Sequence, residues 1–340
     1  MNVRVSEIAV ANPGSSYTQD EMLDLLGLAG DRFAETVFAR CGVERRHFDL
    51  TPDTFGRTLQ ERTAQTEEQL LRLAIEAIDQ LGLDPGEVGT VITATYYSLG
   101  GPTLAHKLIE HYDMDRATDK YHLVGVGCAS SVPLFKLASQ SMRDHPGRHA
   151  LVVAAESITG FMTRVEDDDE RTKTIGFSLF GDGCAAAMLT NGRSVAGPAV
   201  VATQVHQVGG TLGAVHFRLE ADDSFMHIGR ELPGIAKAQL RELVDGFLAT
   251  QGESRDEIAH WLVHPGGRGI IEGVQTGLEL ADEDVAISWD VLDRYGNMGT
   301  PSSFYVLRET IARRSPRAGD LGLMVTIGPG VTIGLMLLKW

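Results

Sequence analysis

Residues 122–138, HLVGVGCASSVPLFKLA, place a cysteine between a short apolar run and a segment with helical periodicity. Residues 121–127 are typical of a buried strand, and residues 130–144 repeat apolar side chains at helical spacing. Cys128 therefore lies at a predicted strand-to-helix turn. The unpaired N–H groups at a helix start lower a cysteine pKa from about 8.5 to between roughly 3.5 and 7.5. The stretch alone leaves two interpretations open, a nucleophile and a buried structural cysteine.

Alternating helices and strands are predicted on both sides of this turn. The first part of the chain has helical periodicity in residues 63–83, 103–114 and 130–144, and β-rich runs at 88–97, 121–127 and 149–157. Strands separated by helix-length segments indicate βαβ units and a mostly parallel sheet.

A related order recurs after the glycine- and proline-containing residues 191–199. The later part contains predicted strands at 200–207, 258–264, 321–328 and 331–339 and predicted helices at 232–249, 267–278 and 299–314. The sequence therefore predicts an α/β protein of two similar halves packed together, residues 1–192 and residues 193–340.

Composition excludes several classes of protein. The 340 residues are 43% hydrophobic, yet no stretch approaches the roughly 20 apolar residues of a membrane span. The amino terminus, MNVRVSEIAVANPG, lacks the pattern of a signal peptide, so we expect a cytoplasmic protein. A net charge of −16 argues against nucleic-acid binding. Three widely spaced cysteines suit neither a disulfide scaffold nor a Cys-x-x-Cys metal site.

One basic cluster departs from this acidic average. Arg40, Arg45 and Arg46 stand close together in the chain and could hold an anionic group such as a phosphate. The alternative is that they are ordinary surface arginines near a turn.

Two further polar residues occur at element boundaries. His264 ends a predicted strand before a Pro-Gly-Gly turn, and Asn297 precedes a predicted helix. Either residue alone is more often structural than functional. His260 and His264 do not form a metal pair, because four residues of a strand span about 13 Å.

Several motifs together resemble the thiolase-fold condensing enzymes, most closely the type III polyketide synthases of the chalcone synthase kind. The ketoacyl-acyl-carrier-protein synthase III enzymes are related to them. The motifs follow in family order along nearly the whole chain: ANPGSSYTQDEM, GVGCAS, LFGDGCAAAML, MHIGRELPGI, HPGGRGIIEGV, YGNMGTPSS and IGPGVTIG. The resemblance implies a thiolase-like fold, layered α-β-α-β-α, and a catalytic triad of Cys128, His264 and Asn297.

The resemblance also implies an activity. A Cys128 thiolate would take an acyl group from an acyl thioester, carried by coenzyme A or an acyl-carrier protein. His264 and Asn297 would then stabilise the charge that develops as a malonyl-type thioester loses carbon dioxide. The backbone N–H groups of Cys128 and Gly328 are candidates for the oxyanion hole during acyl transfer. We expect a homodimer that needs neither a metal nor a separate cofactor.

Departures from the family pattern concern the pocket and its entrance. Matching the plant-type sequences places Thr163 and Met226 where two phenylalanines usually gate the pocket, and Ile327 where a phenylalanine usually stands. Gly299 follows GNM where serine is frequent. By similarity to synthase III enzymes, Arg40, with Arg45 and Arg46, would receive the phosphates of coenzyme A or phosphopantetheine. The starter, the extender and the number of condensations stay open.

Two other functions are compatible with the same residues. The acyl-cysteine could pass its acyl group to an alcohol or an amine without carbon–carbon bond formation. The chain could also be a catalytically silent subunit that binds a carrier protein or a true synthase.

Overall fold

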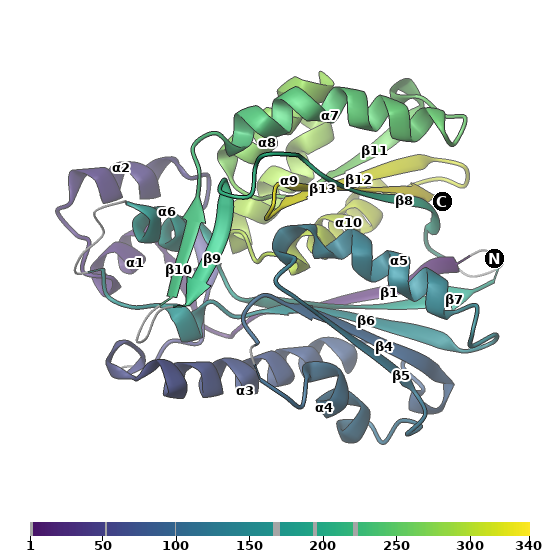
Figure 1. The fold of residues 1–340 in the computed structure, drawn as a ribbon, viewed down its shortest axis with the longest axis horizontal. Helices are drawn as coiled ribbons and strands as arrows, with labels where there is room; N and C mark the ends of the chain where they lie inside the picture. Colours follow the sequence, from purple (N-terminus) through teal and green to yellow (C-terminus); the bar gives the residue numbers. More distant parts are fainter. Residues whose placement is uncertain (1–2, 52, 99, 166–170, 193–195, 220–223) are drawn as a thin grey trace.

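The computed structural model describes residues 3–51, 53–98, 100–165, 171–192, 196–219 and 224–340 (Figure 1). Nine of its strands follow one another in the order β11-β12-β13-β8-β1-β7-β6-β4-β5. Only the pair Arg4–Ala199 joins β1 to β8, so the strands divide into two stacked layers. One layer contains β1 (Val3–Ala11), β7 (Gly183–Asn191), β6 (His149–Glu156), β4 (Val88–Thr95) and β5 (Asp119–Val124). The other contains β8 (Ala199–Gln207), β13 (Thr332–Lys339), β12 (Leu321–Gly328) and β11 (Ile258–Val263).

Helices lie between and outside the two strand layers (Figure 1). Helices α5 (Ser131–Ser141) and α10 (Pro301–Arg314) occupy the middle, where Phe135 stacks on Phe304 with ring centroids 5.0 Å apart. Helices α3 (Leu59–Ile78) and α4 (Leu104–His111) cover the first layer, and α7 (Leu232–Ala249) and α8 (Arg268–Leu278) cover the second. Helix α9 (Asp282–Tyr295) packs beside β11 and α10. This is the predicted α-β-α-β-α order of a thiolase-like fold.

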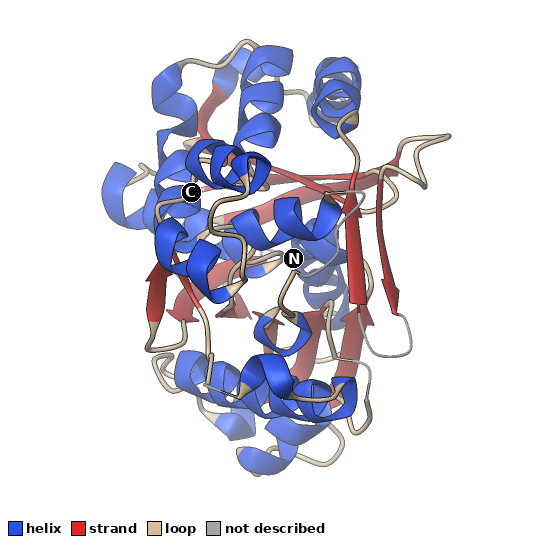
Figure 2. Ribbon diagram, turned by 90° about the vertical axis from the view of Figure 1, so that its left-hand side faces the viewer, coloured by secondary structure: helices blue, strands red, loops and turns tan. Residues whose placement is uncertain are grey.

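A cap of shorter elements gathers at one end of the layers, on the side that faces the viewer in Figure 2. It contains α1 (Gln19–Leu25), α2 (Arg32–Arg40), α6 (Thr172–Leu179), the hairpin of β9 (Val215–Leu219) and β10 (Ser224–Ile228), and the pair of β2 (Ser16–Thr18) and β3 (Arg45–His47). Buried aromatic side chains such as Phe38, Phe48 and Phe161 form the core of this cap. The cap is the part of the fold that closes over the candidate site.

Local sequence signals set the ends of the elements. Helix α3 begins at Leu59, earlier than predicted, because the Thr58 side chain accepts from the Glu61 N–H while the Glu61 carboxylate accepts from the Thr58 N–H. None of the cap elements was predicted, and neither were strand β1 and helix α9.

The strand predicted at residues 121–127 is present but is not buried. Strand β5 ends at Val124 and pairs only with β4, at the edge of its layer. Tyr121 is 42% exposed and Val124 is 44% exposed. An apolar run predicts a strand but does not reveal whether a second strand covers its other edge, so the prediction of burial was wrong.

Candidate active site

Cys128, His264 and Asn297 come from three distant parts of the chain and line one cavity of about 670 Å³. Cys128 lies in the 3-10 turn η3 (Gly127–Ser130), which leads into α5. His264 follows directly after β11, and Asn297 lies in the turn between α9 and α10. The Asn297 Nδ2 atom is 3.8 Å from the Cys128 Sγ atom. The structure thus brings the three predicted triad residues together.

The environment of Cys128 differs from the sequence-based expectation. The thiol lines the cavity and is partly buried, and this burial raises its pKa to about 12, with a further contribution from the charge of Glu156. Turn η3 runs directly into helix α5, which begins at Ser131, so Cys128 does lie near a helix start. The predicted lowering of the Cys128 pKa was nevertheless wrong, because burial is the largest contribution and raises it.

His264 is held from the backbone and from one side chain. The backbone N–H of His264 donates to the carbonyl of Val325, 2.9 Å away. In the imidazole ring, Nδ1 lies 3.3 Å from the Ser303 Oγ. The Nε2 atom has no hydrogen-bond partner among the described residues. Burial lowers the pKa of His264 to about 3, so the imidazole is neutral at pH 7. Because the Ser303 hydroxyl can donate or accept, it is compatible with either neutral tautomer.

Hydrogen bonds fix the orientation of the Asn297 amide. The Gly299 N–H donates to Asn297 Oδ1 at 2.8 Å, and Nδ2 donates to the carbonyl of Gly266 at 3.3 Å. Both ends of the amide lie beside the thiol, with Nδ2 3.8 Å and Oδ1 3.9 Å from Cys128 Sγ. The Asn297 backbone is also paired. Its N–H donates to the Leu179 carbonyl at 2.9 Å, and its carbonyl accepts from the Gly181 N–H at 3.2 Å.

Glu156 is a cavity residue that the sequence analysis missed. It ends β6, is buried, and accepts hydrogen bonds from the Tyr96 N–H at 2.7 Å and from the hydroxyls of Thr95 and Thr300 at 3.4 Å. Burial is the main cause that raises its pKa to about 8. The signal was present in LVVAAE, because an ionisable residue at the carboxyl end of a buried parallel strand lies where α/β proteins bind ligands.

Only some of the predicted pocket residues line the cavity. Ile327 lines the cavity, as does Gly328, where a Cβ would lie only 2.6 Å from the backbone N of Ala129. Met226 lies in β10, and its side chain is outside the described residues. Thr163 does not line the cavity, so its prediction as a pocket residue was wrong. Phe180, which was not predicted, does line it.

A second chamber of about 330 Å³ adjoins the first. Tyr97, Ile158 and Phe180 line both chambers and therefore form the partition between them. Other aromatic rings line the far chamber: Phe161, Phe177 and Phe217. The two chambers together offer an apolar, aromatic surface to a bound acyl group.

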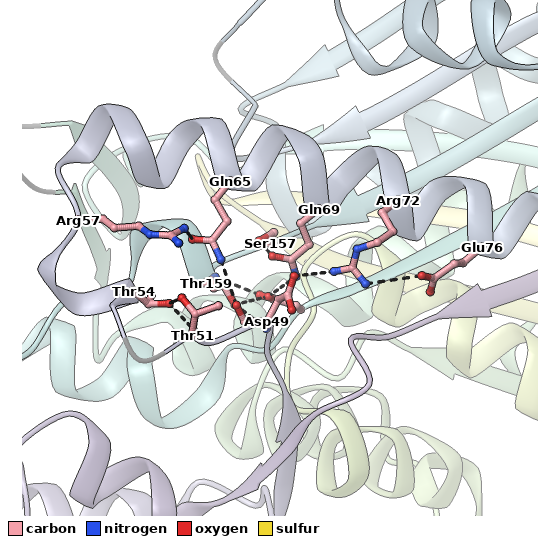
Figure 3. Close-up of polar contacts among 11 residues, drawn as sticks. Asp49, Thr51, Thr54, Arg57, Gln65, Gln69, Arg72, Glu76, Ser157 and Thr159 are labelled. Carbon is pink, nitrogen blue, oxygen red and sulfur yellow. Dashed lines mark hydrogen bonds and ion pairs between the residues drawn. The ribbon is translucent and has the colours of Figure 1, made fainter.

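A buried polar network holds this partition in place. Figure 3 shows Gln69 of α3 reaching toward Ser157 and Thr159. The Asp182 carboxylate accepts from the N–H groups of Ile158, at 2.7 Å, and Thr159, and from the side chains of Thr159 and Gln69. Burial raises the pKa of Asp182 to about 6. Because Asp182 belongs to the turn after Phe180, it ties two sides of the partition, Ile158 and Phe180, to each other.

The three predicted phosphate-binding arginines do not form one cluster. Arg46 is fully buried and donates to the carbonyls of Phe177 and Phe180, so it cannot receive a phosphate, and that prediction was wrong. Arg45 is exposed but faces a different groove, beside His47 and Tyr295.

Arg40 alone lies at the mouth of the cavity. It lines an outer groove together with Arg268, the first residue of α8, which the sequence analysis did not select. The outer groove and the cavity share four lining residues, Ile228, Leu232, Gly266 and Ile270. The groove is therefore continuous with the cavity that contains Cys128.

Two features of the described residues bear on other classes of protein. No described helix is both long and apolar enough to cross a bilayer. Within the same residues, no three or more His, Cys, Asp or Glu side chains gather in a way that could hold a metal ion.

Family comparisons agree with this site. Residues 23–213 match the family described as FAE1/type III polyketide synthase-like protein, and residues 199–340 match the C-terminal domain of chalcone and stilbene synthases.

Individual relatives cover almost the whole chain. The chain is 28% identical to the 3,5-dihydroxyphenylacetyl-CoA synthase of Streptomyces toyocaensis, over 99% of this chain and 90% of that protein. It is 29% identical to the alpha-pyrone synthesis polyketide synthase-like Pks18 of Mycobacterium tuberculosis, over 88% of this chain and 80% of that protein. The crystal structure of PKS-I from the brown alga Ectocarpus siliculosus superposes with a TM-score of 0.91 at 25% identity, covering 99% of this chain and 98% of that one. The chain therefore belongs to the type III polyketide synthase family, a group of acyltransferases with a thiolase-like fold.

Proposed function

We propose that Cys128 is the nucleophile that accepts the starter acyl group. The thiol and the His264 imidazole are both neutral at pH 7, so attack begins with transfer of the thiol proton to Nε2 while the Nδ1–H donates to Ser303. The sulfur then bonds to the acyl carbon, and the carbon–sulfur bond of the donor breaks. The His264 proton passes to the departing thiolate, which leaves as the free thiol. The backbone N–H groups of Cys128 and Gly328 donate hydrogen bonds to the oxyanion of the tetrahedral intermediate.

His264 and Asn297 act on the extender unit. Loss of carbon dioxide from a malonyl-type thioester leaves an enolate, whose negative oxygen is stabilised by the Nδ2–H of Asn297 and by His264 in its other neutral tautomer, in which Nε2–H donates to the enolate and Nδ1 accepts from the Ser303 hydroxyl. The enolate carbon attacks the acyl carbon of the acyl-cysteine. As the new carbon–carbon bond forms, the bond between the acyl carbon and sulfur breaks and Cys128 leaves as the thiolate. This is the decarboxylative condensation of the type III family, and family membership favours it over simple acyl transfer and over a silent subunit.

Substrate delivery uses the outer groove. Arg40 and Arg268 line it, on an otherwise acidic protein, and two guanidinium groups suit the phosphates of a coenzyme A thioester or a phosphopantetheine arm. The acyl group itself would lie in the two aromatic chambers. The named relatives make different products, so the identity of the starter is a matter for experiment.

Assembly is proposed on separate grounds. Strand β5 presents an unpaired edge with exposed Tyr121 and Val124 side chains, and an edge of this kind is suited to pairing with a second copy. A homodimer in the cytoplasm stays a prediction.

The observation that carries the proposal is that Cys128 alone among the three cysteines lines the cavity with His264 and Asn297. Cys41 lies in the outer groove, and Cys184 is buried in β7. Intact-mass measurement after incubation with a panel of acyl-coenzyme A thioesters tests it. We expect an acyl adduct in the wild type, in Cys41→Ala and in Cys184→Ala, and none in Cys128→Ala. An adduct that persists in folded Cys128→Ala would contradict the assignment.

A further inference from the structure

Arg46, in the middle of β3, is a buried cation that the proposed reaction does not use. Its side chain is fully inaccessible to solvent. One guanidinium nitrogen donates to the carbonyls of Phe177 and Phe180, and the other donates to the Gln19 Oε1. None of these partners is charged, and among the described residues no carboxylate forms an ion pair with Arg46. Burying a cation without a charged partner destabilises the folded protein. A buried arginine of this kind is therefore a candidate for a functional role.

The guanidinium is held in one orientation. The rings of Phe38 and Phe48 lie on it, with centroids 5.7 and 5.4 Å from its central carbon. Gln19 is in turn fixed, because its Nε2 donates to the carbonyl of Ser178 at 2.9 Å. Phe38, Phe48 and Gln19 therefore hold the guanidinium so that its N–H groups point toward the backbone of residues 177–180.

The aliphatic stem of Arg46 packs against the turn that carries Asn297. A Cβ at Gly296 would lie 2.8 Å from the Arg46 Cγ, and Gly296 has a φ of +68°. A Cβ at Gly181 would lie 3.4 Å from the Arg46 Cβ. The Gly296 contact leaves no room for a larger residue, whereas the distance at Gly181 is an ordinary van der Waals contact and the Tyr295 carbonyl oxygen, 2.7 Å away, is what requires glycine there. The Arg46 side chain therefore packs against both segments and most tightly against Gly296.

These same two segments bind each other through Asn297. The Asn297 N–H donates to the Leu179 carbonyl and its carbonyl accepts from the Gly181 N–H, so the residues on either side of Phe180 hold both backbone groups of Asn297. The carbonyls that Arg46 anchors, those of Phe177 and Phe180, belong to this same stretch of backbone. A shift of residues 177–181 would therefore move Asn297 relative to Cys128.

We propose that Arg46 is a positioning residue, which sets the place of the Asn297 amide through residues 177–181 and thereby supports decarboxylation. This rests on the proposed role of Asn297. A lysine would keep the charge but cannot hold two carbonyls and Gln19 in the fixed plane of a guanidinium. Arg46 touches no substrate, and Cys128 is held by other elements, η3 and α5.

The test compares the two half-reactions in Arg46→Lys. Malonyl-coenzyme A alone is the probe for decarboxylation, measured as carbon dioxide release, and iodoacetamide is the probe for the Cys128 thiol, measured as alkylation rate. Misplacing a catalytic group by about 1 Å costs about 100-fold, so we expect a loss of that order in kcat for decarboxylation. The KM for malonyl-coenzyme A and the alkylation rate should stay near their wild-type values.

Arg45→Lys is the matched control, because Arg45 is the adjacent residue of the same strand and faces the other groove. It should leave both rates unchanged. Gln19→Leu removes one acceptor of the guanidinium and should lower kcat for decarboxylation, but by less than Arg46→Lys does. If Arg46→Lys does not fold, Gln19→Leu tests the role of Arg46 in its place. Melting temperatures establish that each variant is folded.

The outcomes separate this inference from the proposed function. If Asn297→Ala loses decarboxylation but folded Arg46→Lys and Gln19→Leu keep it, the role of Arg46 is wrong and that of Asn297 stands. An equal fall of decarboxylation and alkylation in Arg46→Lys overturns the inference in favour of a general structural role. If Asn297→Ala itself keeps decarboxylation, the proposed function fails first.

Discussion

At the scale of single residues, the cavity holds the side chains of Cys128, Glu156 and His264 in their neutral forms at pH 7. Burial raises the pKa of Cys128 to about 12 and that of Glu156 to about 8, and it lowers the pKa of His264 to about 3. Because the neutral thiol is a weak nucleophile, we expect Cys128 to react only slowly with small electrophiles such as iodoacetamide. The charge separation needed for acyl transfer then forms only in the presence of the thioester.

Glu156→Gln tests this view through the pH dependence of the thiol. As the pH rises through about 8, Glu156 loses its proton, and its negative charge raises the free energy of a neighbouring thiolate. Glutamine stays neutral, so above pH 8 we expect iodoacetamide to alkylate Cys128 faster in the variant than in the wild type, with similar rates near pH 6. Glu67→Gln, whose carboxylate pairs with Lys107 outside the cavity, is the control. Superimposable alkylation profiles of Glu156→Gln and the wild type would show that Glu156 does not influence the thiol.

At the scale of elements, the turn η4 (Thr159–Phe161) depends on buried hydrogen bonds rather than on apolar packing alone. The Asp182 carboxylate accepts four hydrogen bonds. Two of them come from the backbone N–H groups of Ile158 and Thr159 at the start of this turn. Ile158 and Phe161, which flank this network, line the aromatic chambers. The shape of the acyl-binding chambers is therefore coupled to Asp182.

Asp182→Asn should lower the free energy of unfolding, because its amide NH₂ would face the NH₂ group of Gln69. An unsatisfied buried donor costs about 1 to 3 kcal/mol. Adding Gln69→Glu restores an acceptor opposite the new amide, so the double variant should recover part of the loss, whereas Gln69→Glu alone should destabilise by placing two carboxylates together. Urea unfolding of the four proteins measures the coupling. Additive losses in the double variant would refute direct pairing across this network.

Most elements could be predicted because they depend on local signals: helical periodicity, strand-length apolar runs and turn glycines are patterns of adjacent residues. The predicted triad rested instead on the resemblance of several motifs to a known family, because the position of His264 or Asn297 at an element boundary does not by itself indicate a function. What the sequence could not supply were facts about neighbours in space. The burial of Arg46, the exposed edge of β5 and the raised pKa of Cys128 all depend on segments far away in the chain.

At the scale of the whole molecule, a net charge of −16 repels an anionic thioester. The guanidinium groups of Arg40 and Arg268 in the outer groove attract it at the mouth of the cavity. Arg40→Glu should therefore raise the apparent KM for an acyl-coenzyme A donor. A short thioester without phosphates should be affected much less. The difference should shrink as salt is added, since the Debye length is about 8 Å near physiological ionic strength. An equal loss with both donors would contradict phosphate recognition at Arg40.

The two halves of the molecule each supply part of one cavity. Cys128 belongs to the first predicted half, and His264 and Asn297 belong to the second, so the packing of α5 against α10 brings the nucleophile to its partners. The boundary between residues 192 and 193 stays a prediction. It leads to the expectation that neither half alone would carry the full reaction.

The most direct test of the central claim compares acylation and decarboxylation in Asn297→Ala. Acylation of Cys128 is measured by intact mass with an acyl-coenzyme A donor, and decarboxylation by carbon dioxide release from malonyl-coenzyme A. Losing one donor to a developing oxyanion costs about 100- to 1,000-fold, so the account predicts a loss of this size in carbon dioxide release while the acyl-Cys128 adduct still forms. Undiminished carbon dioxide release, or equal loss of both steps in a folded variant, would contradict it.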